Sequence, residues 1–323
     1  QPRPRAYLRE INTMSRDLFC PTGRIYRGNL HGHCTHSDGR NEAAEVVRLY
    51  REAGYDFTCL SDHYWTDPRY SAETVCDSSG LDSDDFITII SAELHCHGKL
   101  YDQAGLWHIL ANGLPLDFPI ASATETGPEL VSRAVAAGAF VSIPHPEWYA
   151  MTTEEARSLA EAGAHAVEAY NHSSALDAGR GGGIATIDQL ANEGFRTGII
   201  ATDDSHDVPA DGFGGWVMVA AEALKAGAII KALKAGDYFA SCGPAFTSIR
   251  LDGTMLHVTC SPVDRILVAA GGHRSFATSG DGMTEARIEI SRTDFEFFRV
   301  VLTDRAGKQA WSNHYWMDDL GLR

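Results

Sequence analysis

The stretch that decides the fold is EAAEVVRLYREAGYDFTCL, residues 42–60. Apolar residues recur at helical spacing from Glu42 to Ala53, Gly54 follows, and Phe57–Leu60 form a short apolar strand. The glycine stands where the end of a helix needs a left-handed residue. The same order of helix, glycine and strand recurs at residues 128–143, 154–170 and 184–201. Short apolar strands separated by helices indicate a parallel sheet that is covered by helices.

The number of strands favours a barrel. Additional strands are expected near residues 25–31, 86–92 and 106–111, which makes seven in all. We therefore predict an α/β barrel over residues 1–242. An open, doubly wound sheet is the alternative, although no GxGxxG motif follows the first strand. After residue 242, turn signals such as Asp252-Gly253 separate short strands, which predicts a small, antiparallel, β-sandwich-like domain over residues 243–323.

The composition narrows the class of protein. A net charge of −16 argues against a nucleic-acid partner, because phosphate backbones bind to basic faces. The seven cysteines are scattered without CxxC pairs, which is typical of reduced thiols. No apolar run of about 18 residues is present, so no membrane span is expected. The first residues resemble no signal peptide, and we expect a cytoplasmic protein, although the missing initiator Met is also compatible with a removed leader.

Histidine and acidic residues follow nearly every predicted strand. Successive strand ends carry His31, His33 and Asp38; Asp62 and His63; Glu93; His108; His145; His172; and Asp203, Asp204 and His206. In a βα barrel the carboxyl ends of the strands meet at the face that holds the active site. Nitrogen and oxygen ligands of these kinds suit zinc, manganese or iron. The sequence therefore predicts a metal site at this face.

The order of these motifs resembles that of a known superfamily. HxH at 31–33, SDG at 37–39, SDH at 61–63, a Glu after the third strand, PHP at 144–146 and DxH at 204–206 are similar to the polymerase-and-histidinol-phosphatase (PHP) superfamily. The chain looks most like its branch of carbaryl- and carbamate-hydrolase-like proteins, whose terminal β segment also ends in a Trp-Ser-Asn phrase. The resemblance covers about residues 25–320. It implies a distorted (βα)7 TIM-like barrel, the PHP fold.

The resemblance also implies a trinuclear site that holds two to three divalent ions, either zinc, manganese or iron. His31, His33, Glu93 and Asp204 would hold the first ion, Glu93 would bridge to a second ion completed by His108 and His145, and Asp38, His63 and His206 would hold the third. Two assignments stay open. His36 competes with Asp38, and either His95 or His97 could replace His108. Asp62 and Asp203 are expected to orient ligand histidines.

A cluster of divalent ions predicts a hydrolase, because the ions lower the pKa of a bridging water and polarise the bond under attack. Glu93 and Asp204 are the expected catalytic residues. A phosphoesterase acting on a small molecule is favoured, since three ions offer more positive charge than a neutral carbonyl needs. A carbamate, ester or amide hydrolase is the alternative, and a non-catalytic metal-binding module is the remote one.

Phosphate recognition calls for Arg or Lys on the metal face, and the sequence offers Arg40, Lys99 and Arg180. His172 and Arg180 are the expected substrate contacts. The glycine-rich stretch around Arg180, residues 179–183, is expected to be either a flexible connector or a mobile loop that contacts phosphate.

Overall fold

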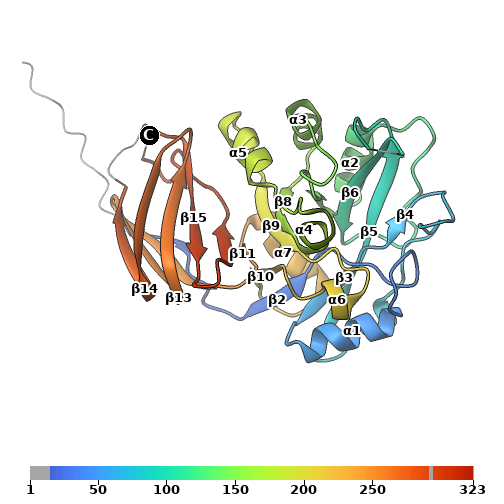
Figure 1. Cartoon of the computed structure of the whole chain (residues 1–323), viewed down its shortest axis with the longest axis horizontal. Coiled ribbons are helices and arrows are strands. Elements are labelled where there is room, and N and C mark those ends of the chain that lie inside the picture. Colours follow the sequence, from blue (N-terminus) through green and yellow to red (C-terminus); the bar gives the residue numbers. More distant parts are fainter. Residues whose placement is uncertain (1–14, 103, 291–293, 323) are drawn as a thin grey trace, which may run out of the picture.

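A computed structural model describes residues 15–102, 104–290 and 294–322 (Figure 1). Its first part is a sheet in which neighbouring strands pair in the order β10, β2, β3, β5, β6, β7, β8 and β9. Their bounds are β2 Ile25–Asn29, β3 Phe57–Leu60, β5 Ile87–His97, β6 Leu106–Asn112, β7 Phe140–Ile143, β8 Ala166–Asn171, β9 Gly198–Thr202 and β10 Trp216–Ala220. A short strand, β4 (His63–Tyr64), extends the parallel pairing along β5.

Two strands depart from the parallel sheet that the sequence predicts: β10 at one end of this order, which is antiparallel to β2, and β6 in the middle. β2, β3 and β5 are parallel, as are β7, β8 and β9, but β6 is antiparallel to both of its neighbours. Residues 98–105 alone connect β5 to β6, and a parallel pair needs a crossover of about a dozen residues or more. The beginning of β6 therefore lies at the sheet edge where β5 ends.

Helices cover this sheet, as the helix, glycine and strand pattern predicts. Their bounds are α1 Ala43–Glu52, α2 Gly127–Ala136, α3 Thr153–Glu161, α4 His172–Ala178, α5 Ile184–Asn192, α6 Val208–Asp211 and α7 Ala226–Ala235, with a 3-10 turn, η1, at Ser79–Leu81. The glycines that follow α1, α2, α3 and α5 all have positive φ, between 81° and 105°: Gly54, Gly138, Gly163 and Gly194. This conformation confirms the predicted helix ends. Capping boxes begin α2 and α3.

The strands after β10 are antiparallel and gather at one end of the molecule (Figure 1). They are β11 Tyr238–Ser241, β12 Phe246–Asp252, β13 Met255–Ala270, β14 Ser275–Glu289, β15 Phe297–Thr303, β16 Gln309–Ser312 and β17 Tyr315–Trp316. β1 (Ser15–Phe19) pairs with β12, although the sequence analysis placed these first residues with the barrel. β11 pairs with both β10 and β16, so the hydrogen-bonded ladder continues across residue 242.

Separate apolar clusters fill the two parts. Leu130, Leu159 and Leu190 belong to a cluster between the helices and the sheet, whereas Ile249, Val258 and Val300 belong to one among the C-terminal strands. Burial of such aliphatic side chains stabilises each part by about 1.5–3 kcal/mol per residue. Among the helices of the described residues, none has both the length and the apolar character needed to cross a lipid bilayer.

Candidate metal centre

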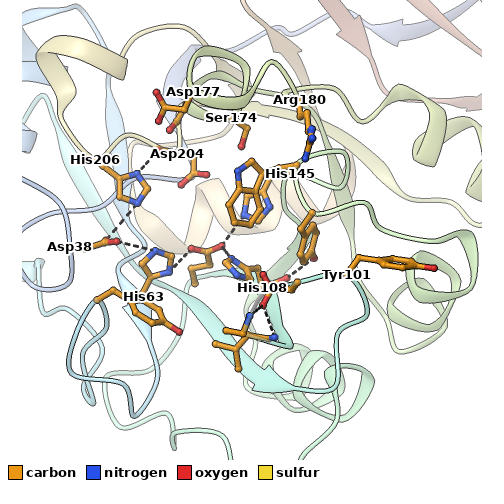
Figure 2. Close-up of a pocket in the computed structure, with 18 residues that line it drawn as sticks. Asp38, His63, Tyr101, His108, His145, Ser174, Asp177, Arg180, Asp204 and His206 are labelled. Atoms are coloured by element: carbon orange, nitrogen blue, oxygen red, sulfur yellow. Dashed lines mark hydrogen bonds and ion pairs between the residues drawn. The ribbon is translucent and has the colours of Figure 1, made fainter.

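A cavity of about 660 Å³ opens at the edge where the parallel strands end. His31 and His33 follow β2, His145 follows β7, and Asp204 and His206 follow β9. Because β6 is antiparallel, His108 near its beginning reaches the same edge, opposite His95 of β5. Figure 2 shows side chains of Asp38, His63, His108, His145 and His206 that converge on one space at the floor of the cavity.

The most deeply buried group consists of His31, His33, Glu93 and Asp204, whose ligand atoms lie within 4.8 Å of one another. The Nε2 atoms of His31 and His33 lie 3.1 and 2.9 Å from Oδ1 of Asp204. His31 Nε2 is also 3.5 Å from Oε2 of Glu93. This is the set that the resemblance to the PHP superfamily implies for the first ion.

Glu93 lies at the centre of the cluster. Its Oε1 is 2.8 Å from His108 Nδ1 and 3.0 Å from His145 Nε2. Its Oε2 faces His31 and lies 2.8 Å from His63 Nδ1. The two oxygens of one carboxylate thus face two different groups of imidazoles, which is the geometry that a bridging ligand needs.

A third group combines His33, Asp38, His63 and His206. His63 and His206 each place Nε2 3.6 Å from an oxygen of Asp38. His36, the competing residue, turns away, and its Nε2 lies 2.8 Å from the carbonyl oxygen of Thr74. The structure therefore brings Asp38, and not His36, to the cluster.

His95 joins the cluster together with His108, although the sequence treats them as alternatives. His95 Nε2 lies 2.8 Å from His63 Nδ1, and its Nδ1 lies 3.0 Å from the carbonyl oxygen of Trp107. Donation from Nδ1–H to this carbonyl leaves the lone pair on Nε2, the nitrogen that faces the cluster. His97 does not take part, because its ring packs against Trp65.

Unpaired polar atoms show that the cluster fits cations. His31 Nε2, His33 Nδ1 and Glu93 Oε2 are buried and make no hydrogen bond of suitable geometry among the described residues, although His31 Nε2 lies 3.1 Å from Asp204 Oδ1 and Glu93 Oε2 lies 2.8 Å from His63 Nδ1. Buried polar atoms are nearly always paired, so three orphans in one cluster indicate a missing partner. The donor set of imidazole nitrogens and carboxylate oxygens suits zinc, manganese or iron.

The pKa shifts differ among the candidate ligands. Burial opposes protonation of His31, His63 and His145, but the neighbouring carboxylates outweigh it and raise the pKa of these imidazoles, to about 9 for His63, so a bound cation would displace protons from them. Burial, reinforced by His206 and His63, holds the pKa of His33 well below its usual value, which favours the neutral imidazole. Burial opposes ionisation of Glu93, but His63, His108 and His31 outweigh it and hold its pKa well below the usual range. Neutral imidazoles and ionised carboxylates are the forms that bind metal ions.

Only one of the three expected cations lines the cavity. Arg180 lines the cavity together with Ser174 and Asp177 (Figure 2). Arg40 pairs with Asp207 at 3.1 Å, and Lys99 is buried in an ion pair with Glu155. Arg40 and Lys99 therefore have acidic partners of their own and are not among the described residues that line the cavity.

His172, an expected substrate contact, is not among the described residues that line the cavity. Its Nδ1 lies 2.9 Å from the hydroxyl of Tyr170, and a Cβ added to Gly214 would meet its ring at 2.1 Å. The ring is thus half-buried, in contact with Tyr170 and packed against Gly214.

Two acids beside the cluster hold loop backbone. Asp62 accepts hydrogen bonds from the backbone N–H groups of Cys34 and Ser37, and Asp203 accepts from those of Phe213, Gly214 and Gly215. They were expected to orient histidines, and they instead shape the loops that carry ligand candidates.

Sequence reasoning missed two parts of the site. Tyr70, Tyr101, Trp148 and Tyr149 contribute aromatic side chains to the lining of the cavity, and no periodic signal distinguishes them from core residues. Glu168 is completely buried beneath the cluster and lies 2.8 Å from His31 Nδ1. An acidic residue inside the apolar strand β8 was an available signal for it.

The fold is similar to that of a solved bacterial protein. A two-domain protein from Bacteroides vulgatus, described as containing a predicted PHP-like metal-dependent phosphoesterase, has a TM-score of 0.53 and 15% identity, over 93% of this chain and 97% of that one. An amidohydrolase from Chromobacterium violaceum, solved with bound sulfate and no metal, has a TM-score of 0.42 and 14% identity, over 57% of this chain and 89% of that one.

No protein-family model and no curated protein matches the chain. At 15% identity the likeness to the Bacteroides protein shows a shared fold. The carbamate-hydrolase-like branch stays a prediction from the sequence motifs.

Proposed function

We propose that this protein is a metal-dependent phosphoesterase of the PHP superfamily. The observation that carries the proposal is the group of buried atoms on His31, His33 and Glu93 that make no hydrogen bond of suitable geometry, beside an open cavity that Glu93 lines. Divalent ions in such a cluster lower the pKa of a water molecule and polarise the bond under attack. The fold likeness to a PHP-like protein supports the same class.

The chain's own residues have distinct tasks in this proposal. Glu93 and Asp204 supply the negative charge that retains the ions, and the imidazoles complete the three groups. Arg180 is exposed and lines the cavity. None of the ion pairs between described residues includes it, so its guanidinium is available to an anionic group. Trp148 and Tyr101 offer aromatic surface against which an apolar leaving group could pack.

The proposal includes the architecture inferred from the motifs. Residues 1–242 would form the distorted (βα)7 barrel, and residues 243–323 the β domain. The separate apolar cluster of the C-terminal strands supports this division, with β1 contributed by the beginning of the chain.

A carbamate, ester or amide hydrolase is the second candidate. This candidate is favoured because Arg180 is the only one of the three expected cationic side chains that lines the cavity, and because Tyr70, Tyr101 and Trp148 contribute aromatic lining. A neutral carbonyl substrate needs no arginine, whereas a phosphate ester benefits from one.

The test compares kcat/KM for p-nitrophenyl phosphate, a p-nitrophenyl phosphodiester and an aryl N-methylcarbamate at one metal loading. We expect a phosphate ester to be preferred at least tenfold, or about 1.4 kcal/mol of transition-state stabilisation. Arg180→Gln should raise KM for the phosphate ester and leave that for the carbamate unchanged. A tenfold preference for the carbamate would establish the second candidate. A metal-loaded protein that turns over neither class would be the non-catalytic module.

A further inference from the structure

Glu168 is a carboxylate whose four strong hydrogen bonds all support the metal centre. It lies on β8 and is completely buried. Oε1 lies 2.8 Å from His31 Nδ1 and accepts from the Thr202 hydroxyl at 2.7 Å. Oε2 accepts from the backbone N–H of His145 at 2.6 Å and from Asn171 Nδ2 at 2.8 Å. Glu168 belongs to none of the groups of described residues whose ligand atoms lie within reach of one ion.

The contact with His31 selects one tautomer of the imidazole. An ionised carboxylate can only accept, so His31 must donate from Nδ1–H. In the neutral imidazole the lone pair is then on Nε2, which lies 3.1 Å from Oδ1 of Asp204 and 3.5 Å from Oε2 of Glu93. This is the orientation in which the imidazole can bind an ion.

The other contacts hold backbone that would not adopt its conformation alone. His145 and Asp204 have φ angles of +27° and +54°, in the left-handed region that side chains disfavour. Glu168 accepts directly from the N–H of His145. Asn171 Nδ2 lies 2.8 Å from Glu168 and 3.0 Å from Oδ2 of Asp204, so it connects the two carboxylates.

We propose that Glu168 is the positioning residue of the metal centre. It fixes the tautomer of His31 and the placement of His145 and Asp204, three candidate ligands from three separate strand ends. This inference rests on the metal centre of the proposed function and is independent of which bond is hydrolysed.

The test is the metal affinity of Glu168→Gln, measured with Zn²⁺ alone by competition against a chelator. Gln has nearly the same shape as Glu but no negative charge. Its amide NH2 group would replace one carboxylate oxygen and would face two hydrogen-bond donors instead of accepting from them. We expect a ten- to hundredfold weaker affinity, as for other outer partners of metal ligands. The absorption spectrum of the Co²⁺-loaded variant should also change, because the ligands are reoriented.

Glu155→Gln is the matched control. Glu155 is also buried, accepts from the backbone N–H of Leu100 and pairs with Lys99, but it contacts no ligand candidate. This variant should lower Tm and bind Zn²⁺ with unchanged affinity. Thr202→Val, which removes one donor from Glu168, should weaken binding two- to tenfold and serves if Glu168→Gln does not fold.

The outcomes separate this inference from the proposed function. Wild-type protein that binds less than one equivalent of Zn²⁺ would overturn the metal centre and the inference with it. Normal wild-type binding, with Glu168→Gln or Thr202→Val within twofold of it, would overturn the inference alone. A loss of affinity as large in Glu155→Gln would also overturn it, because the effect would then come from destabilisation.

Discussion

His36 and Asp38 show how two neighbouring residues acquire different tasks. Both closely follow the HxH motif at residues 31–33, and the sequence leaves both as candidate ligands. Residues 35–38 form a turn, so the alternation of an extended strand cannot decide between them. Asp38 reaches His63 and His206, whereas His36 connects the turn to Thr74.

Separate substitutions of Asp38 and His36 distinguish their contributions. Asp38→Asn removes the only carboxylate of the third group, so we expect it to lose about one equivalent of metal and at least tenfold in kcat/KM. His36→Gln should keep both within about twofold. Elemental analysis and steady-state kinetics give the two readouts. The reverse result would return the ligand role to His36.

Glu93→Gln should lose more activity than any other single ligand change. Both oxygens of Glu93 face imidazoles of different groups, and a neutral amide cannot supply charge to two ions. We expect more than about a hundredfold loss of kcat/KM and the loss of two metal equivalents. His97→Gln, on the ring packed against Trp65, is the matched control and should be near wild type. Retention of activity in Glu93→Gln together with its loss in His95→Ala would make our assignment of this strand wrong.

At the scale of elements, the glycine-rich loop at residues 179–183 is a close-packed connection. The sequence predicts a flexible connector or a mobile loop here, yet its backbone is bonded on both sides. Gly181 accepts from the N–H of Asn171, and Gly182 donates to Glu147 at 2.7 Å. The glycines are needed for close approach, since a Cβ on Gly183 would lie 1.8 Å from the carbonyl oxygen of Glu168.

Gly183→Ala should therefore destabilise the protein by about 2 kcal/mol or more, the usual cost of overpacking against atoms that cannot move away. Gly80→Ala is the control, because a Cβ there meets nothing within 4 Å and φ is not positive. It should change the free energy of unfolding by less than about 0.5 kcal/mol. Urea denaturation of both variants measures the difference. Equal, small effects would mean that the loop is as flexible as its composition suggests.

For the whole molecule, regular local patterns could be predicted from sequence, and contacts between distant segments could not. The helix ends at Gly54 and Gly138 follow from a local rule. The direction of β6 and the pairing of β1 with β12 depend on how the chain returns in space. The predicted ligands converge because strand ends meet at one edge. The role of Glu168 could not be predicted from sequence, because its partners lie at the ends of three separate strands, β2, β7 and β9.

Contact between the two parts also depends on long-range pairing. Arg299 of β15 is buried and pairs with Asp188 of α5 through its two terminal nitrogens, Nη1 and Nη2. Its Nη1 also lies 3.3 Å from His314 Nε2. Burial and the neighbouring Arg299 lower the pKa of His314 to about 3, so this histidine is neutral and accepts from the guanidinium. No local pattern in the sequence connects these three residues.

Metal removal should reveal how far the centre stabilises the whole fold. Without cations, the buried carboxylates of Glu93 and Asp204 lie close together among crowded imidazoles, and Asn171 donates to Asp204. We expect two to three equivalents of zinc, manganese or iron in protein purified without chelator. A ligand present at a hundredfold excess over its Kd stabilises the native state by about 2.7 kcal/mol, so chelation should lower Tm by about 5 °C.

Re-addition of the metal should restore Tm, and Glu93→Gln should show neither change, because it no longer retains the ions. Calorimetry with and without chelator, together with elemental analysis, provides the measurement. Fewer than one equivalent, with no rise in Tm when Zn²⁺, Mn²⁺ or Fe²⁺ is added, would contradict the metal centre. In that case the orphaned atoms of His31, His33 and Glu93 would have to be satisfied by ordered water, and the cluster would lose its link to hydrolysis.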